Sequence, residues 1–238
     1  MLRRVAVIVA NIGAIAAKTA TATIPIVFAT NDDPVKRGLV ASLARPGANL
    51  TGVNYFNAEV VAKRLGLLHE LVPKAVRVAM LLDPQNANAT TLQRVQEVAP
   101  VIGLQIRILN ASTSEEIDAA FTTLARERPD ALFVGTSAFF SDRRVQFATL
   151  AARERIPAAY PNRLFVLAGG LMSYGTSLED AFRQVGIYTG SILKGAKPAD
   201  LPVVQATRFE FSINRQTART LGIEVPEALL ATADEVIE

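Results

Sequence analysis

Four short loops carry the side chains that could bind a small molecule, and each follows an apolar run. The first is Thr30–Asp33, which comes directly after Ile24–Ala29. The others are Asp83–Asn88, Gly135–Ser141 and Tyr160–Arg163. Together they offer hydroxyls, amides, one or two carboxylates and aromatic rings. This inventory suits a small zwitterion or a polyol held by hydrogen bonds and ring contacts.

The elements before and after these loops predict an α/β fold with Rossmann-like parallel sheets and helices on both faces. The expected strands are Val5–Ala10, Ile24–Ala29, Val76–Leu82, Leu104–Leu109, Ala131–Val134 and Ile156–Ala159. The expected helices are Gly13–Thr21, Pro34–Leu43, Ala58–Leu71, Ala89–Ile102, Ser114–Arg128 and Asp142–Arg155. Ligands of such sheets bind beyond the carboxyl ends of the strands, where all four loops are expected.

Two breaks in the alternation predict two lobes. The turn-rich segment Arg45–Tyr55 precedes the helix Ala58–Leu71, and Leu167–Ser177 precedes a helix at Leu178–Leu193. Such breaks indicate that the chain leaves one sheet for another. We expect residues 1–55 plus 171–202 to form a first, incomplete ligand-binding lobe. Residues 56–170 plus 203–238 are expected to form the second.

Each candidate residue also has an ordinary structural explanation. Asp33 before Pro34 is typical of a helix N-cap followed by proline at the first helical position, and Asp83 before Pro84 is typical of a turn. For these two carboxylates, capping or turn formation is the better explanation. Asn86, Thr136 and Ser137 are common loop residues, and Phe139 can be a core residue. Their shared edge of the sheet is what favours a binding site.

Signatures of catalysis and of metal or cofactor binding are missing from the sequence. It has no Gly-rich phosphate loop, no dinucleotide fingerprint and no nucleophile turn of the Gly-x-Ser-x-Gly type. It contains no cysteine, and its one histidine, His69, has no second histidine four residues later. We therefore expect no enzyme activity, no metal and no cofactor.

The composition is that of a folded protein without a nucleic-acid partner. Of 238 residues, 50% are hydrophobic, and the formal net charge is +3. The basic residues occur as scattered pairs and form no stripe with interleaved aromatic residues. The start, Met1–Ala10, has the order of a signal peptide, but its short β-branched run is interrupted by Asn11 and Gly13 and fits a first strand better. No segment has the roughly 18 to 20 unbroken apolar residues of a membrane helix.

Several blocks of the sequence resemble bacterial ABC-transporter substrate-binding proteins of the family that includes tryptophan- and tyrosine-type binders. These blocks are Ile24–Ala29, Asp33–Gly47, Asn49–Val53, Gly169–Gly175, Gln184–Gly190, Leu193–Gly195 and Phe209–Asn214. The resemblance implies a type I periplasmic-binding fold with two α/β lobes, an interlobe ligand cleft and three crossovers. We expect those near Gly52–Asn57, Leu167–Leu171 and Val203–Ser212. It also implies an ABC permease as partner and a place in the periplasm, or on a membrane anchor outside the cytoplasm.

The sequence differs from the family pattern at its start. Members of the family have an export or lipoprotein signal and two further βα units before the strand that matches Val5–Ala10. We therefore expect that the first lobe of this sequence is incomplete. Either the sequence starts inside a longer gene, or the protein is a truncated version with an exposed sheet edge that favours pairing with another chain. The missing units would carry part of the pocket.

The resemblance and the polar loops together predict a non-catalytic solute-binding protein, with an amino acid, aromatic ones included, as the favoured ligand. The expected binding residues are Thr30, Asn31 and Asp33 from the first lobe, Gln85, Asn86, Thr136 and Ser137 from the second, and Asn54 and Tyr174 from the crossovers. Hydroxyls and helix N-termini would bind a carboxylate, an Asp or Asn side chain would bind an amino group, and Tyr160 or Phe139 would contact a ring. A sensory or regulatory ligand-binding domain remains an alternative, and a doubly wound α/β enzyme is a weaker one.

Overall fold

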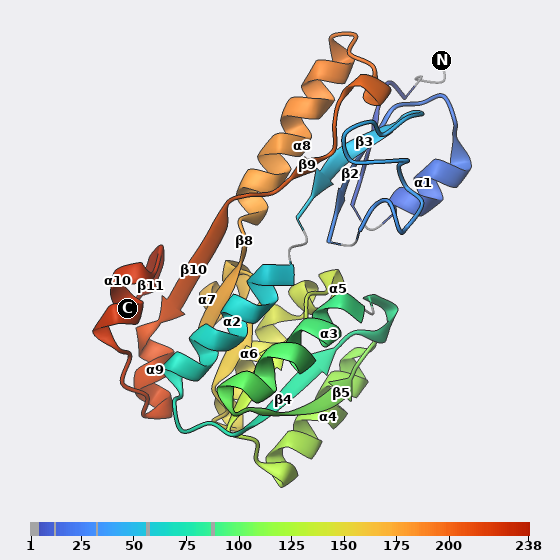
Figure 1. Cartoon of the computed structure of the whole chain (residues 1–238). Coiled ribbons are helices and arrows are strands. Elements are labelled where there is room, and N and C mark those ends of the chain that lie inside the picture. Colours follow the sequence, from blue (N-terminus) through green and yellow to red (C-terminus); the bar gives the residue numbers. More distant parts are fainter. Residues whose placement is uncertain (1–4, 12, 32, 56–57, 87–88) are drawn as a thin grey trace. The chain divides into compact units, whose positions relative to one another are not determined.

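The computed structural model of the chain (Figure 1) describes residues 5–11, 13–31, 33–55, 58–86 and 89–238. The chain divides into two compact units. Unit 1 comprises Met1–Asn57 and Thr176–Arg208, and unit 2 comprises Ala58–Gly175 and Phe209–Glu238. The backbone therefore passes from one unit to the other three times.

Unit 1 is built on a parallel sheet of four strands in the order β1-β2-β3-β9. The strands are β1 (Ile8–Ala10), β2 (Ile26–Thr30), β3 (Leu50–Asn54) and β9 (Val204–Gln205). Because successive side chains point to opposite faces, Ile26 and Phe28 pack with Ala14 of α1 (Ala14–Ala20). Val27 and Ala29 pack with α8 (Leu178–Leu193) on the other face. The two helices thus cover opposite faces of this sheet (Figure 1).

Unit 2 contains a sheet of seven strands in the order β11-β10-β8-β7-β6-β4-β5. The strands are β4 (Arg77–Leu82), β5 (Gln105–Asn110), β6 (Ala131–Val134), β7 (Ala158–Tyr160), β8 (Met172–Thr176), β10 (Phe209–Asn214) and β11 (Glu235–Ile237). The α-helices are α2 (Ala58–Leu71), α3 (Ala89–Val98), α4 (Ser114–Glu127), α5 (Ala138–Asp142), α6 (Arg144–Arg153), α7 (Arg163–Leu167), α9 (Arg215–Leu221) and α10 (Glu227–Thr232). Short 3-10 turns occur at Pro84–Asn86, Ala99–Ile102 and, in unit 1, Pro198–Asp200.

Helices bury the central strands of unit 2 on both faces. Every residue of β6 is 0% exposed, which explains why this strand is apolar throughout rather than alternating. Phe133 faces the core formed with α2 and α3, and Leu132 faces the core formed with α4 and α6. α2 and α3 lie side by side over one face of the sheet (Figure 1). The predicted doubly covered parallel sheet is therefore confirmed.

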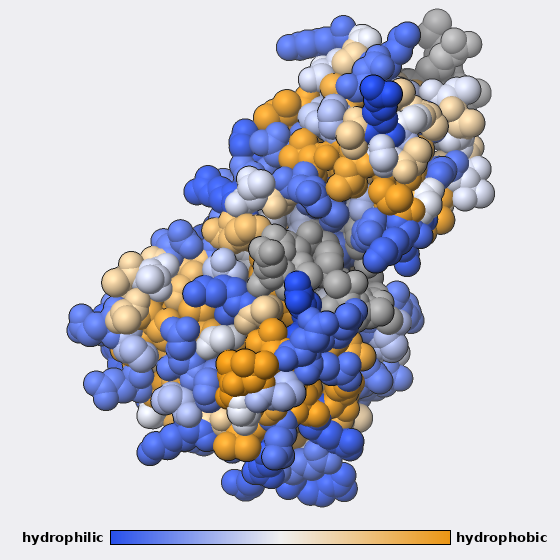
Figure 2. All heavy atoms as spheres, viewed as in Figure 1, coloured by the Kyte–Doolittle hydropathy of each residue, from blue (hydrophilic) through white to orange (hydrophobic). Residues whose placement is uncertain are grey.

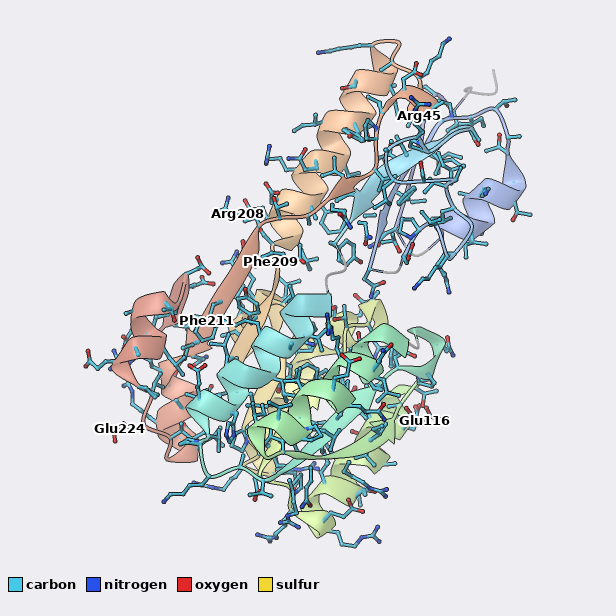
Figure 3. All side chains as sticks on the ribbon, viewed as in Figure 1. Arg45, Glu116, Arg208, Phe209, Phe211 and Glu224 are labelled. Carbon is cyan, nitrogen blue, oxygen red and sulfur yellow. The ribbon has the colours of Figure 1, made fainter. Side chains whose placement is uncertain are left out.

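Local sequence signals fix the ends of the helices. The hydroxyl Oγ1 of Thr113 accepts a hydrogen bond from the backbone N–H of Glu116 at 3.2 Å. The Glu116 carboxylate, labelled in Figure 3, accepts one from the backbone N–H of Ser112 at 2.6 Å. Thr113 is therefore the N-cap of α4, and the Glu116 carboxylate binds the N–H of the residue before that cap.

One predicted helix is wrong. The segment Pro34–Leu43 forms a turn, with Gly38 at φ 66°, followed by irregular backbone. The backbone N–H of Leu39 bonds to the carbonyl of Pro34 at 2.8 Å, which closes the turn. Because the left-handed conformation at Gly38 cannot continue a helix, the proline and the apolar residues after it do not extend the helical pattern.

The boundaries between the units also differ from the predicted ones. Residues 171–175 lie in unit 2, because Met172 and Ser173 of β8 pair with β7. Residues 203–208 lie in unit 1, because Val204 and Gln205 pair with β3. The second passage between the units therefore follows Gly175 rather than falling within Leu167–Leu171. The predicted first crossover, Gly52–Asn57, ends in residues 56–57, which lie outside the described residues.

The visible surface of both units mixes hydrophilic and hydrophobic residues (Figure 2). The most exposed large apolar side chains are Val101, Val145 and Leu193, at 83%, 61% and 61%. They come from separate helical segments, and isolated apolar side chains of this kind are normal on soluble surfaces. Within the described residues, no helix has the length and apolar character to cross a membrane.

Candidate ligand-binding site

The carboxyl ends of β4 and β6 in unit 2 hold a buried acid–hydroxyl pair. Ser137 donates its hydroxyl hydrogen bond to Oδ2 of Asp83 at 2.7 Å. Oδ1 of Asp83 accepts the backbone N–H of Gln85 at 3.0 Å, and Ser137 Oγ accepts the N–H of Phe140 at 3.4 Å as the N-cap of α5. Asp83 is 6% exposed and Ser137 is 1% exposed. The turn role expected for Asp83 is therefore present, and the same carboxylate also orients Ser137.

Thr136 and Gln85, two other predicted residues of these loops, are more exposed than Asp83 and Ser137. Thr136 is half-buried directly before Ser137. Gln85 is exposed, and its backbone rather than its side chain contacts Asp83. Asn86 belongs to the 3-10 turn Pro84–Asn86, but its side chain lies outside the described part of the chain.

Unit 1 brings Thr30 and Asn54 together at the carboxyl ends of neighbouring parallel strands. The two residues are register partners in β2 and β3, and Asn54 is 5% exposed. The Thr30 carbonyl accepts the N–H of Tyr55 at 2.9 Å, and the Asn54 carbonyl accepts that of Ala206 at 2.8 Å. Asn31 follows Thr30 and is half-buried. The strand ends thus present a hydroxyl and two amides from one edge of the sheet.

Asp33 caps a turn rather than a helix. Its Oδ1 accepts the backbone N–H groups of Val35 at 2.9 Å and Lys36 at 3.2 Å. Its Oδ2 lies 3.9 Å from Lys36 Nζ, and the carboxylate is 45% exposed. One oxygen is committed to the backbone of the turn, and the exposed side of the group faces solvent.

Tyr160 lies in the core of unit 2. Its ring is 0% exposed and stacks on Phe165 with centroids 4.8 Å apart. Its hydroxyl has no hydrogen-bond partner among the described residues, and burial raises the pKa of the Tyr160 hydroxyl. The alternative ring, Phe139, is half-buried beneath the Arg143 guanidinium, whose Cζ lies 5.3 Å from the ring centroid. Of the two, Phe139 is the ring that a ligand can reach in this structure.

Tyr174 belongs to an aromatic group that the sequence analysis did not assemble. Its ring centroid lies 6.4 Å from that of Phe209 and 6.3 Å from that of Phe211. Figure 3 labels both phenylalanines on β10, where their spacing of two places them on one face. Burial, and secondarily the negative charge of Asp234, raise the pKa of the Tyr174 hydroxyl. Alternation of aromatic residues in Phe209–Phe211 was the signal available in the sequence.

The described side chains contain no group of three or more His, Asp or Glu residues that could hold a metal ion. The hydroxyl, amide, carboxylate and ring groups at the strand ends are hydrogen-bonding and packing groups. Their arrangement is suited to holding a small polar molecule.

The chain has two α/β units, each built on a sheet with parallel strands, and the backbone passes between them three times. Together with the polar groups beyond the strands, this defines a solute-binding protein of the type I periplasmic-binding fold. The chain belongs to the family of ABC transporter substrate binding proteins, whose sequence pattern it matches over residues 2–237. Members of this family are substrate-binding proteins rather than enzymes, as the sequence predicts.

Three relatives are similar over most of this chain. A tyrosine-binding protein of Clostridioides difficile (strain R20291) is 27% identical over 210 residues, which are 88% of this chain and 60% of that protein. An ABC domain from Streptococcus pneumoniae in complex with L-Trp is 27% identical, with a TM-score of 0.87, 97% of this chain covered and 78% of that one. A conserved domain protein from Vibrio cholerae is 29% identical, with a TM-score of 0.87, 98% of this chain covered and 79% of that one. The chain spans about 60% of the length of the tyrosine-binding protein.

Removing the Ser137 hydroxyl should destabilise the chain. Ser137→Ala is expected to lower the free energy of unfolding by about 1.5–3 kcal/mol, because a buried carboxylate loses a hydrogen-bond donor. Urea unfolding followed by circular dichroism measures this. Thr136→Ala removes a neighbouring, half-buried hydroxyl and is the matched control, with an expected loss below about 1 kcal/mol. Equal losses in the two variants would contradict a specific Asp83–Ser137 bond.

Proposed function

We propose that this chain is the solute-binding component of an ABC importer and that its ligand is an amino acid, with the aromatic ones favoured. The observation that carries this proposal is the match over residues 2–237 to a substrate-binding family in which one relative is a tyrosine-binding protein and another was crystallised with L-Trp. The hydroxyl, amide and carboxylate groups beyond the strands support an amino acid over an apolar ligand.

The proposed contacts follow from where each side chain lies. The hydroxyl of Thr136 and the amide of Gln85 serve the polar groups of the ligand in unit 2. Ser137 is buried and donates its hydroxyl to Asp83, so it holds this loop in place rather than contacting the ligand. Tyr174, with Phe209 behind it, provides a surface on which an aromatic ring packs. Thr30, Asn31, Asn54 and the exposed side of Asp33 are the polar contacts proposed for unit 1. Tyr160 is left out of this set because its ring is fully buried.

The partner that we propose is an ABC permease, which receives the ligand outside the cytoplasm. The family supplies this inference, since its members are substrate-binding proteins of ABC transporters. The energy for transport is then provided by the ATPase of the transporter, and this chain contributes only ligand capture and delivery.

Ligand-dependent stability tests the proposal. A ligand that binds only the folded chain, at one hundred times its dissociation constant, adds about 2.7 kcal/mol of stability. For a chain of this size that corresponds to a rise in Tm of roughly 5–11 °C. L-Tyrosine or L-tryptophan is expected to produce such a shift, and sugars are expected to produce none. A shift with a sugar and not with any amino acid would contradict the proposed ligand class.

A further inference from the structure

Arg64 is a buried cation in the middle of an apolar helix face. It lies on α2 between Val61, Leu65 and Leu68, all of which belong to the core of unit 2. The whole residue is 1% exposed, and among the described residues neither Nε nor Nη2 has a hydrogen-bond partner. Its guanidinium carbon lies 4.3 Å above the centroid of the Phe133 ring. Spacing alone would have assigned this position to a leucine.

This arrangement is energetically unfavourable in the form that the structure shows. A buried guanidinium without an anion or a full set of acceptors loses its hydration, and one cation–π contact returns only part of that loss. Burial lowers the pKa of Arg64 to about 9, so that the group is still charged at neutral pH. A charged guanidinium buried in an apolar core is stabilised by an anionic partner, and the described residues do not supply one for Arg64.

The position of Arg64 relates it to the polar strand ends of unit 2. Phe133, which the guanidinium covers, pairs in register with Met80 of β4. Asp83 follows Met80 by three residues, roughly 10 Å along the strand at about 3.3 Å per residue. Ser137 follows Phe133 by four residues. Arg64 therefore lies beneath the same two strands whose ends carry the Asp83–Ser137 pair.

Asp83 does not pair with Arg64 within the described residues, since Nε and Nη2 of Arg64 have no hydrogen-bond partner there. The two oxygens of the Asp83 carboxylate accept the Gln85 N–H and the Ser137 hydroxyl. A ligand with its own carboxylate would bring the missing negative charge to this end of the unit. Guanidinium groups bind carboxylates through two parallel hydrogen bonds, which use the nitrogens that are unpaired in Arg64.

We propose that Arg64 is a ligand-binding residue whose guanidinium turns from the Phe133 ring to the carboxylate of the bound ligand. This inference rests on the proposed function, and it specifies that the ligand is recognised through a carboxylate in unit 2. It also assigns specificity: an amine that lacks the carboxylate leaves Arg64 unpaired and binds weakly.

Calorimetric titration of matched ligands onto the whole chain tests this role. The probes are L-tyrosine and L-tryptophan, their decarboxylated forms tyramine and tryptamine, and benzoate. The wild-type chain is expected to bind the preferred amino acid at least about 100-fold more tightly than its amine. In Arg64→Met the amino-acid affinity should fall about 100-fold, whereas the amine affinity should stay the same. Lys63→Met removes an exposed charge from the same helix and should change neither affinity.

The outcomes separate this inference from the proposed function. An Arg64→Met variant that folds and still discriminates acid from amine like the wild type would overturn the role of Arg64 while leaving amino-acid binding intact. Arg64-dependent binding of benzoate alone would support Arg64 and refute the amino acid. If the wild-type chain binds none of the carboxylates, both proposals fail. If Arg64→Met does not fold, Arg64→Lys decides: reduced affinity with retained preference for the acid supports the role, and unchanged affinity overturns it.

Discussion

Phe147→Ala is expected to lower the free energy of unfolding by about 3–5 kcal/mol, because it removes a large buried ring and leaves a cavity. Phe147 is 0% exposed on α6. Its centroid lies 6.0 Å from that of Phe121 on α4, 4.9 Å from Phe140 on α5 and 5.9 Å from Phe165 on α7. Three other helices therefore meet at one ring, and none can move inward without breaking its own contacts.

Chemical unfolding of the variant measures this loss, and Phe182→Ala is the matched control. Phe182 lies on α8 with 47% of its surface exposed, so its removal should cost less than about 1 kcal/mol. Because Phe140 donates its backbone N–H to Ser137, Phe147→Ala should also loosen the acid–hydroxyl pair at the strand ends. A Phe147→Ala chain as stable as the Phe182→Ala chain would show that the aromatic group does not support unit 2.

Elements with a strong hydrophobic pattern were predictable from the sequence. The helices Ala58–Leu71 and Leu178–Leu193 and the strand Ala131–Val134 have the predicted bounds. The two helices bury one regular face against a sheet and the strand is buried on both faces, so local pattern and tertiary packing agree. The sequence missed strands where local pattern and tertiary packing disagree. β3 lies inside the turn-rich Arg45–Tyr55, and β8 lies inside a Gly-rich break, because sheet partners stabilise extended backbone that propensity disfavours.

The candidate site was predictable in its location but only partly in its bonding. The predicted parallel strands place the loop that begins at Thr30 at the carboxyl edge of the sheet. Asn54 was assigned to a crossover, and its register pairing with Thr30 depends on β3, which the sequence did not predict. The hydrogen bond from Ser137 to Asp83 joins residues 54 positions apart, and nothing in either loop alone specifies it. The burial of Arg64 and Tyr160 was harder to predict. It depends on the rotation of α2 for Arg64 and on the neighbouring Phe165 ring for Tyr160. The hydrophobic pattern does not predict a buried polar side chain such as that of Arg64, and such side chains are the ones to test for a role in function.

Gly175→Ala is expected to lower the free energy of unfolding by about 3 kcal/mol, the upper part of the range for overpacking a buried site. A Cβ at position 175 would lie 1.8 Å from the carbonyl oxygen of Pro161 and 2.9 Å from its carbon. These are backbone atoms, so no side-chain rotation relieves the overlap. The loop after β7 has to move, and with it Asn162, whose Oδ1 accepts the N–H of Leu164 at the start of α7 at 3.1 Å.

The same substitution should weaken ligand binding, since Gly175 directly follows Tyr174 in β8 and a displaced strand moves the ring from Phe209 and Phe211. Gly186→Ala on α8 is the matched control: an added Cβ there has no atom of the described residues within 4 Å. In a helix interior that change should stabilise the chain by about 0.5–1 kcal/mol. Opposite signs for the two variants in urea unfolding are therefore expected. Equal stabilities would mean that the loop after β7 yields freely, and that close backbone packing does not hold Tyr174 in place.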